Sequence, residues 1–357
     1  MKIGVLTYHN TNNFGAALQC YALQKKINDY GHSCEIIDYR NSLVSSDNRN
    51  KESLIKKMVR MPLLKYKKSK FNKFTKKFIN ISRITFNDNN ISNDLYDLFV
   101  IGSDQVWNYK INGGDTTYMM DFVSNPQKIR TYACSIGNID IPEEILLNYK
   151  KYLSRIDNIL VREESTKNFV KKLTNKNAII VPDPVFLLSK DEWDKLSNKS
   201  TKKGEYVISY FVGKSSSKVV NNIYEHISNG TKLLKIAGGL SISDLKNKNI
   251  KVDFGISPID FVNYIKNSKF VITDSFHATA FCLLFNKPFV VFLANDYAKD
   301  SRIISLLKKY KMESHIYSNS LKDIDKMTTI YNNDENTIRL NMEANENLQK
   351  YTLKENK

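Results

Sequence analysis

Short apolar runs alternate with amphipathic stretches along most of the chain. Residues 2–8 (KIGVLTY) and 34–39 (CEIIDY) have the β-branched and aromatic content of buried strands. Residues 14–31 between them carry apolar positions at helical spacing and end at a glycine. Strand, helix and strand in this order predict a βαβ unit with a parallel sheet. The alternation continues and predicts further elements: strands over 98–104, 129–137, 158–162 and 178–186, and helices over 144–155 and from Ser165.

A polar stretch at residues 189–205 breaks the alternation, and we expect a hinge between two domains there. Beyond it, a second α/β series has a helix that opens with a serine cap and a proline near residue 257. Its predicted strands lie at 206–212, 232–239, 269–274 and 288–293. The predicted fold class is therefore α/β, with two domains facing a central cleft. The expected boundaries are 1–190 for an N-terminal α/β domain, 205–325 for a C-terminal α/β domain, and 330–357 for a helical tail packing back on the N-terminal domain.

The composition fits a globular two-domain protein but adds a strong positive charge. The 357 residues are 41% hydrophobic and 25% charged, with a formal net charge of +17, which favours anionic ligands or an anionic surface. The four cysteines show no spacing suited to zinc, and we expect buried free thiols in a reducing compartment. The first residues predict a strand, not a signal peptide, and no window is apolar enough to span a bilayer. We therefore expect a cytoplasmic protein.

Residues 51–78 form a basic segment with eleven lysines and arginines against one acid. Apolar side chains recur in it at helical spacing: Leu54, Ile55, Met58, Val59, Phe71, Phe74 and Phe78. A basic amphipathic helix of this kind can lie on an anionic membrane. The alternative is a surface helix whose apolar stripe packs on the domain and whose lysines are only solvated. No nucleic-acid-binding motif is present, so nucleic acid is not an expected partner.

A histidine stands at the start of a strongly apolar helix in the second half. The run VITDSFHATAF places a predicted strand first, then the N-cap residues Asp274 and Ser275, then His277 in the first helical turn. Ligands of open α/β sheets bind at the carboxyl ends of strands, and the free N–H groups of a helix start favour an anion. His277 is thus a candidate for binding or protonating an anionic ligand. The alternative is a histidine satisfied within a packed turn.

Polar side chains crowd the first strand-to-helix turn, TYHNTNNFGAALQ. Its single glycine, Gly15, does not make a dinucleotide-binding loop. The amides of Asn10, Asn12 and Asn13, beside His9, donate and accept hydrogen bonds and so suit sugar hydroxyls. Asparagine is also common in turns for backbone reasons, so both interpretations stay open.

The strand in FVIGSDQVWN ends in a second polar group. Asp104, Gln105 and Trp107 together offer an acid, an amide and a flat apolar face, which can hold a polyol. Alternatively, Asp104 is an N-cap and Trp107 a core residue.

Cationic side chains end neighbouring predicted strands. Arg162 follows the strand NILV and can grip a carboxylate or phosphate with two parallel bonds; a surface pair with the adjacent glutamates is the alternative. Lys299 and Arg302 follow the strand at 288–293. Together with His277 they suit one small ligand carrying phosphate and carboxylate. The sequence has no magnesium-type carboxylate cluster, P-loop, HExxH or GxSxG, so no metal is expected.

Six motifs in order resemble the polysaccharide pyruvyl transferase family over roughly residues 2–307: LTYHNTNNFGAALQCYALQ, FVIGSDQVWN, YACSIG, LVREES, VPDPVFLL and VITDSFHATAFCLLFNKPFVVF. The resemblance implies two Rossmann-like domains facing a central cleft, similar to the GT-B glycosyltransferases. The N-terminal domain would lie on the acceptor side and the C-terminal domain on the donor side. It also implies phosphoenolpyruvate as donor substrate, without a further cofactor. The implied acceptor is a hydroxyl pair on a sugar of a cell-surface polysaccharide or its lipid-linked precursor.

The resemblance associates His277 with the pyruvyl donor and matches Arg162 to the arginine of the family's VRE turn. We expect catalytic roles for His277, Arg162 and Asp104, with Asp104 or His9 accepting a sugar proton. The expected ligand-binding residues are Ser275, Lys299, Arg302, Asn12, Asn13 and Gly15. A lipid-linked acceptor fits an enzyme whose basic segment contacts the inner face of the plasma membrane. Two other functions stay open: a GT-B-type glycosyltransferase with a nucleotide-sugar donor, and a glycan- or membrane-binding protein without activity.

Overall fold

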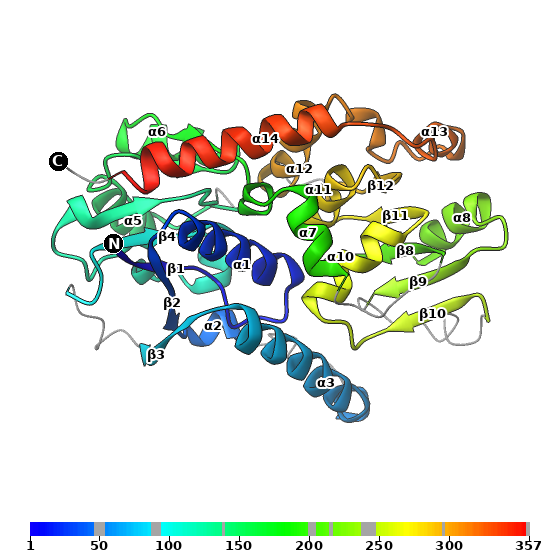
Figure 1. The fold of residues 1–357 in the computed structure, drawn as a ribbon, viewed down its shortest axis with the longest axis horizontal. Helices are drawn as coiled ribbons and strands as arrows, with labels where there is room; N and C mark the ends of the chain where they lie inside the picture. The colour runs from blue at the N-terminus through cyan, green and yellow to red at the C-terminus, as the bar shows by residue number, and fades with distance from the viewer. Residues whose placement is uncertain are drawn as a thin grey trace.

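The computed structural model describes residues 1–45, 54–86, 94–137, 140–198, 205–213, 217–236, 248–294 and 297–354. Figure 1 shows two α/β halves side by side, with the N-terminal half on the left and the sheet formed after residue 205 on the right.

The N-terminal half is built on a five-stranded parallel sheet in the order β3-β2-β1-β4-β5. Its strands are β1 (Lys2–Leu6), β2 (Ser33–Tyr39), β3 (Ile81–Phe86), β4 (Leu98–Ile101) and β5 (Ile129–Thr131). Single bridges through Cys134 join Asp104 to Val161, which lies in the short parallel pair β6 (Leu160–Val161) and β7 (Ile179–Ile180). The helices of this half are α1 (Phe14–Asp29), α2 (Ser42–Ser45), α3 (Leu54–Phe78), α4 (Tyr109–Asn112), α5 (Glu143–Leu153), α6 (Glu164–Thr174) and α7 (Lys190–Ser197), with the 3₁₀ turns η1 (Thr116–Met119), η2 (Pro126–Lys128) and η3 (Pro184–Leu187).

The C-terminal half repeats this plan with a parallel sheet in the order β10-β9-β8-β11-β12. Its strands are β8 (Tyr206–Tyr210), β9 (Lys232–Ile236), β10 (Ile250–Asp253), β11 (Phe270–Thr273) and β12 (Phe289–Val291). In both sheets the strand order reverses beside the first strand, which is the arrangement of a Rossmann-type sheet and the place where ligands bind. The remaining helices are α8 (Ser217–Ile227), α10 (Pro258–Asn267), α11 (Phe276–Leu284), α12 (Tyr297–Tyr310), α13 (Leu321–Met327) and α14 (Asp334–Asn347), with the short helices η4 (Glu313–His315) and η5 (Leu348–Thr352).

Two predicted strands end earlier than expected, and the stretch in which a hinge was expected contains a helix. The expected hinge at 189–205 is helical over α7, because Ser189 and Glu192 form a capping box and Trp193 is fully buried; residues 199–204 lie outside the described part. The strand predicted over 178–186 ends at Ile180, where the proline-containing segment turns into η3. The strand predicted over 129–137 ends at Thr131.

Aromatic side chains at the start of α1 hold the two halves together. Phe14 stacks on Phe261 of α10 with ring centroids 4.6 Å apart, and it meets Tyr210 at 5.6 Å edge to face. All three rings are buried. Such aromatic pairs contribute about 1 kcal/mol beyond the area that they bury, so this contact fixes the start of α1 against the C-terminal half.

The helix α14 runs from the C-terminal half back over the N-terminal half, along the top of the view in Figure 1. Asn341 donates to the backbone oxygens of Phe186 and Leu187 in η3 at 2.8 and 3.1 Å. Tyr132 donates its hydroxyl to the backbone oxygen of Ala344 at 3.1 Å. The tail thus ties the two halves together a second time.

Helix α3 packs on the N-terminal half through its C-terminal part. Phe71 and Phe74 are buried in the core, and Phe71 lies 5.1 Å from Phe14 between ring centroids. The apolar positions predicted at 54–59 lie where side chains are outside the described part. Among the described helices, none is long and apolar enough to cross a membrane. All four cysteines are free and buried.

The buried His315 predicts a pH-dependent stability. Its ring packs between Phe289 and Tyr331, and neither ring nitrogen has a hydrogen-bond partner among the described residues. Burial lowers the pKa of His315 to about 4, whereas the unfolded chain binds this proton near pH 6.5. The stabilisation is therefore complete above about pH 6.5 and is lost as the pH falls towards 4.

We expect His315→Phe to reduce the fall in unfolding free energy between pH 7 and pH 5 by about 2 kcal/mol. Urea unfolding of both proteins at the two pH values measures this difference. An equal fall in both would show that His315 takes up its proton as readily in the folded chain as in the unfolded chain.

Candidate active site

The site begins where β4 ends, at Gly102, Ser103 and Asp104. Asp104 has a left-handed backbone (φ 81°) that is rare for residues other than glycine. Its Oδ1 accepts from the backbone N–H of Gln105 at 2.9 Å. Backbone conformations of this kind persist where the surrounding structure requires them and are frequent at functional sites. The turn directs the Asp104 carboxylate towards Arg162, the next residue of the site.

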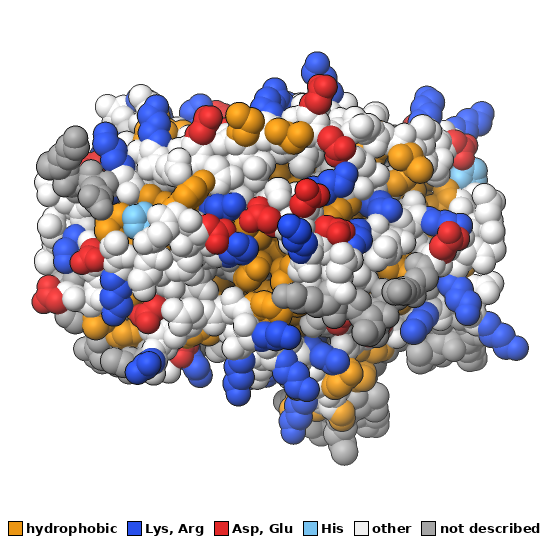
Figure 2. Space-filling view, viewed as in Figure 1, with side chains coloured by type: hydrophobic (Ala, Val, Ile, Leu, Met, Phe, Trp, Pro, Cys, Tyr) orange, Lys and Arg blue, Asp and Glu red, His pale blue; other side chains and the backbone are white. Residues whose placement is uncertain are grey.

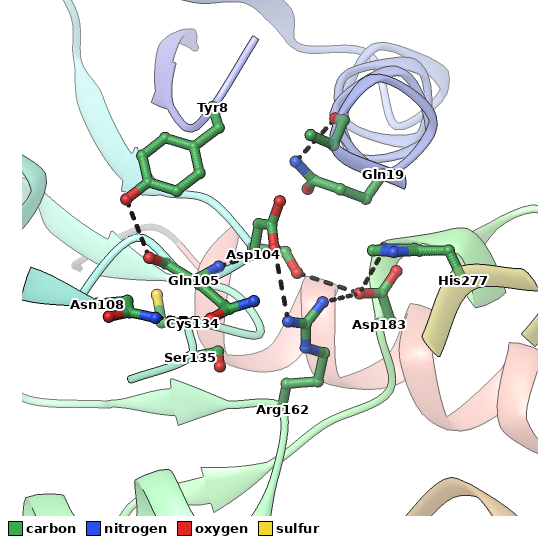
Figure 3. A network of polar contacts seen from close by, with 12 residues as sticks. Tyr8, Gln19, Asp104, Gln105, Asn108, Cys134, Ser135, Arg162, Asp183 and His277 are labelled. Atoms are coloured by element: carbon green, nitrogen blue, oxygen red, sulfur yellow. Dashed lines mark hydrogen bonds and ion pairs between the residues drawn. The ribbon is translucent and has the colours of Figure 1, made fainter. Parts of the chain in front are cut away.

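Arg162 follows β6 and is almost completely buried among carboxylates (Figure 3). Its Nη1 donates to Oδ2 of Asp183 at 2.6 Å. Its Nη2 lies 3.7 Å from Oδ1 of Asp104, and its Nε lies 3.6 Å from Oε2 of Glu163. The face of the guanidinium is covered by the ring of Phe276, 4.9 Å away. The side chain is therefore held on several sides before any ligand binds.

His277 reaches the same carboxylate from the C-terminal half. It lies in the first turn of α11, where Ser275 caps the helix by accepting from the backbone N–H of Ala278 at 3.3 Å. The Nε2 of His277 lies 3.6 Å from Oδ2 of Asp183, so Asp183 stands between the imidazole and Arg162. The imidazole and the guanidinium, which come from different sheets, thus meet at one buried acid.

Gly15 of α1 lies directly against the imidazole. A Cβ atom placed on Gly15 would be 2.0 Å from Nδ1 of His277, far inside van der Waals contact. Only a residue without a side chain lets α1 approach His277 this closely. Asn13 caps the same helix by accepting from the backbone N–H of Ala16 at 3.2 Å.

Arg302 of α12 supplies a second guanidinium to the site. With its amide oxygen turned towards Arg302, Gln105 accepts from Nη1 at 3.1 Å and from Nη2 at 3.3 Å. The hydroxyls of Ser165 and Ser301 are 3.0 Å apart and join α6 to α12 beside it. A cation of the C-terminal half is thus anchored to the turn that follows β4.

The electrostatics keep the central charges in place. Burial raises the pKa of Asp183, but the neighbouring His277 and Arg162 outweigh it and hold that pKa well below its usual range. Burial lowers the pKa of Arg162, but the surrounding carboxylates raise it by more, so the net shift is upward. Burial, and then the charge of Arg162, lower the pKa of Arg302. Neighbouring carboxylates therefore outweigh burial for Arg162 but not for Arg302.

Several buried donors of the site have no hydrogen-bond partner among the described residues. They are Nε and Nη2 of Arg162, Nε of Arg302 and Nε2 of His277. Leaving a buried donor unpaired costs about 1–3 kcal/mol, and more for a charged group. Three of these nitrogens lie 3.6–3.7 Å from a carboxylate oxygen, beyond hydrogen-bond distance, so a ligand with acceptor oxygens would complete their hydrogen bonds.

The other residues predicted for the site lie elsewhere or have other partners. His9 points away: its Nε2 contacts Oδ1 of Asp38 at 2.9 Å and its Nδ1 lies 3.3 Å from the backbone oxygen of Thr7. Asn12 is exposed, and the side chain of Lys299 lies outside the described part. Trp107 is a core residue.

The sequence reasoning did not assign a role to Asp183 or Glu163. Asp183 is buried. It caps η3 by accepting from the backbone N–H of Val185 at 3.1 Å. The sequence feature that could have indicated Asp183 is its place between two prolines at the end of a predicted strand, in VPDPVF. Glu163 is buried and accepts from Ser135 at 2.7 Å.

Comparison with solved structures shows the fold. UDP-GlcNAc 2-epimerase from Neisseria meningitidis bound to UDP-GlcNAc has 10% identity and a TM-score of 0.53, with 99% of this chain and 100% of that chain covered. The Methanocaldococcus jannaschii epimerase in complex with UDP-GlcNAc and UDP has 12% identity and a TM-score of 0.52, with 95% and 98% covered. These neighbours share the GT-B-like arrangement of two Rossmann-like domains that the sequence predicted. Comparison with curated proteins gave no match.

A sequence model described as polysaccharide pyruvyl transferase matches residues 13–297, which include α1, the turn after β4, Arg162, Asp183 and His277. The resemblance seen in the six sequence motifs is thereby confirmed. The chain belongs to the polysaccharide pyruvyl transferase family of enzymes.

Proposed function

We propose that the protein transfers a pyruvyl group from phosphoenolpyruvate to two hydroxyls of one sugar, in a cell-surface polysaccharide or its lipid-linked precursor. The observation that carries the proposal is the group of buried, unpartnered donors on Arg162, Arg302 and His277. Membership of the family supports the reaction class.

Phosphoenolpyruvate matches these donors in chemistry. It carries a carboxylate and a phosphate on a three-carbon frame, and guanidiniums bind both groups through parallel hydrogen bonds. Nη2 of Arg162 and Nε of Arg302 supply such donors.

The reaction takes a proton from each of two sugar hydroxyls and adds one proton to C3 and one to the departing phosphate. A proton is added to the methylene carbon C3 while a sugar hydroxyl bonds to C2 and gives up its proton. The bond between C2 and the phosphate oxygen then breaks, and the second hydroxyl bonds to C2 with loss of its proton. The products are the ketal and inorganic phosphate. Cationic donors around the phosphate favour the charge that develops as it leaves.

Two residues fit the proton transfers. His277 is assigned as the acid that protonates C3 or the leaving phosphate. Asp104, whose Oδ1 lies 3.7 Å from Arg162 in the turn after β4, is assigned as the acceptor of a hydroxyl proton. Asp183 acts as a positioning residue, because it contacts both Arg162 and His277.

We expect His277→Gln to lower the release of phosphate from phosphoenolpyruvate at least a hundredfold, since a positioned acid contributes roughly 10²–10⁴ in rate. The assay supplies p-nitrophenyl glycosides as acceptors. The control His226→Gln changes a surface histidine that pairs with Asp325 and leaves the rate unchanged. Wild-type turnover in His277→Gln would exclude the assigned role.

A thermal shift experiment separates this proposal from a glycosyltransferase with a nucleotide-sugar donor. A ligand that binds only the native state raises the melting temperature. We expect phosphoenolpyruvate to raise it and UDP-GlcNAc to leave it unchanged. A shift with UDP-GlcNAc alone would favour the glycosyltransferase.

Gly15→Ala tests the contact between α1 and the imidazole. In an unobstructed helix this change stabilises by about 0.5–1 kcal/mol, but here the new methyl group meets His277. We expect a destabilisation of about 1–3 kcal/mol and at least tenfold slower phosphate release. In a His277→Ala background the same change should no longer destabilise, and chemical unfolding of the four proteins measures this coupling. An equal destabilisation in both backgrounds would show that the new methyl group does not act through His277.

We also propose that helix α3 contacts an anionic membrane, which would bring a lipid-linked acceptor to the enzyme. Figure 2 shows lysine and arginine side chains gathered along the lower edge of the molecule at α3, beside hydrophobic side chains. Tyr66 and Met61 are 53% and 43% exposed on this helix. The sequence of α3 contains no acid. The exposed lysines of its described part are Lys65, Lys68, Lys73, Lys76 and Lys77.

Each lysine near an anionic bilayer contributes about 1 kcal/mol. We therefore expect changing Lys65, Lys68, Lys73 and Lys76 to glutamate to lower binding to phosphatidylglycerol vesicles at least a hundredfold in cosedimentation. The control with the same net charge changes four exposed lysines of α5 and α6 to glutamate: Lys150, Lys151, Lys171 and Lys172. Equal losses in both variants would show a non-specific effect of net charge.

A further inference from the structure

We propose that a basin on the N-terminal half binds a sugar residue of the acceptor glycan other than the one that receives the pyruvyl group. This inference rests on the proposed function, because it assigns a second contact for the same acceptor. The basin has a volume of about 580 Å³, which is enough for a monosaccharide unit. Its walls come from the end of β2, the segment at 112–117 and helix α5.

The lining of the basin has the chemistry of a carbohydrate site. The hydroxyl of Tyr39 and the amide of Asn41 both donate to Oδ2 of Asp115, each at 2.7 Å, and so fix two walls against each other. Asp121 accepts from Thr116 through Oδ2. Carboxylate and amide groups held by their neighbours provide the oriented donors and acceptors that sugar hydroxyls need.

Two polar groups of the basin remain available for a ligand. Oδ1 of Asp121 and the side-chain amide of Asn148 have no hydrogen-bond partner among the described residues. Asn148 is exposed on α5 at the edge of the basin. The carboxylate accepts and the amide both donates and accepts, so the pair can bind adjacent hydroxyls of one ring.

The acidic lining of the basin disfavours the anionic ligands that suit the Arg162 site. In a chain of net charge +17 the basin is lined by the carboxylates of Asp115 and Asp121. The cation at its rim, Arg40, is paired with Asp38 through two hydrogen bonds at 3.0 and 2.9 Å. In the described part of the chain no cluster of histidine, cysteine and acidic side chains could hold a metal ion. A neutral polyol is therefore favoured over a phosphate or a metal.

The position of the basin points to an extended acceptor. Tyr39 also lines a narrower pocket with Tyr8 and Tyr118 at the carboxyl end of β1. These three rings form a wall, with Tyr118 edge-on to Tyr8 at 5.1 Å and to Tyr39 at 5.6 Å. The hydroxyl of Tyr8 donates to the backbone oxygen of Gln105, which is part of the Arg162 site (Figure 3). None of the donor residues of the Arg162 site lines the basin, so we infer that a sugar in the basin is a neighbour of the one that reacts.

The test fills the basin without touching the Arg162 site. Asn148→Trp places a large ring at the edge of the basin, and the control Lys150→Trp places the same ring on α5, two residues on, outside the lining. Saturation-transfer NMR is recorded with p-nitrophenyl glycosides of glucose, galactose, mannose and the corresponding N-acetylhexosamines, with no donor present. We expect transfer to at least one glycoside in wild type and Lys150→Trp, and at least a fivefold loss in Asn148→Trp.

Two outcomes would overturn the inference: no transfer to any of these glycosides in the wild type, or equal transfer in Asn148→Trp and Lys150→Trp. The melting-temperature rise with phosphoenolpyruvate is measured on the same variants and should be equal in all three. A missing rise in the wild type would contradict the proposed donor while leaving the NMR result to decide on the basin.

Discussion

The buried carboxylate of Asp183 is the point where the chemistry of both halves meets. It accepts from Arg162 at 2.6 Å and lies 3.6 Å from His277. A buried carboxylate without such partners would be strongly destabilising. The interaction that keeps Asp183 charged therefore also fixes the guanidinium of one half and the imidazole of the other. Removing this acid would disturb the domain contact and the site together.

Charge differs between three regions of the molecule. The excess of lysine lies on the outer surface and on α3, while the Arg162 site sets two guanidiniums among three carboxylates. The basin beside Tyr39 is lined by acids and amides. The net charge of +17 thus comes from the surface, and the interior of the Arg162 site and the basin both carry acids.

The regular parts of the fold follow from sequence because their apolar periodicity is strong. The apolar pattern predicts the central strands and α1 clearly. The edge strands β3 (ISRITF) and β10 (IKVD) mix polar and apolar residues and carry little apolar signal. Helix α7 was not predicted because most of its residues are charged. Its serine cap and the buried Trp193 are the features that indicate a helix. Arg162 and His277 were found because each ends or follows a strand. Asp183 and the turning of His9 towards Asp38 depend on tertiary contacts that spacing alone does not encode.

The close packing of Gly15 on His277 and of Phe14 on Phe261 has a consequence for how ligands enter. The side chain of Arg162 is only 2% exposed, so a molecule from solution reaches it only if the groups packed around it move. The fit of α1 against the C-terminal half therefore controls access to this guanidinium as well as the position of the imidazole.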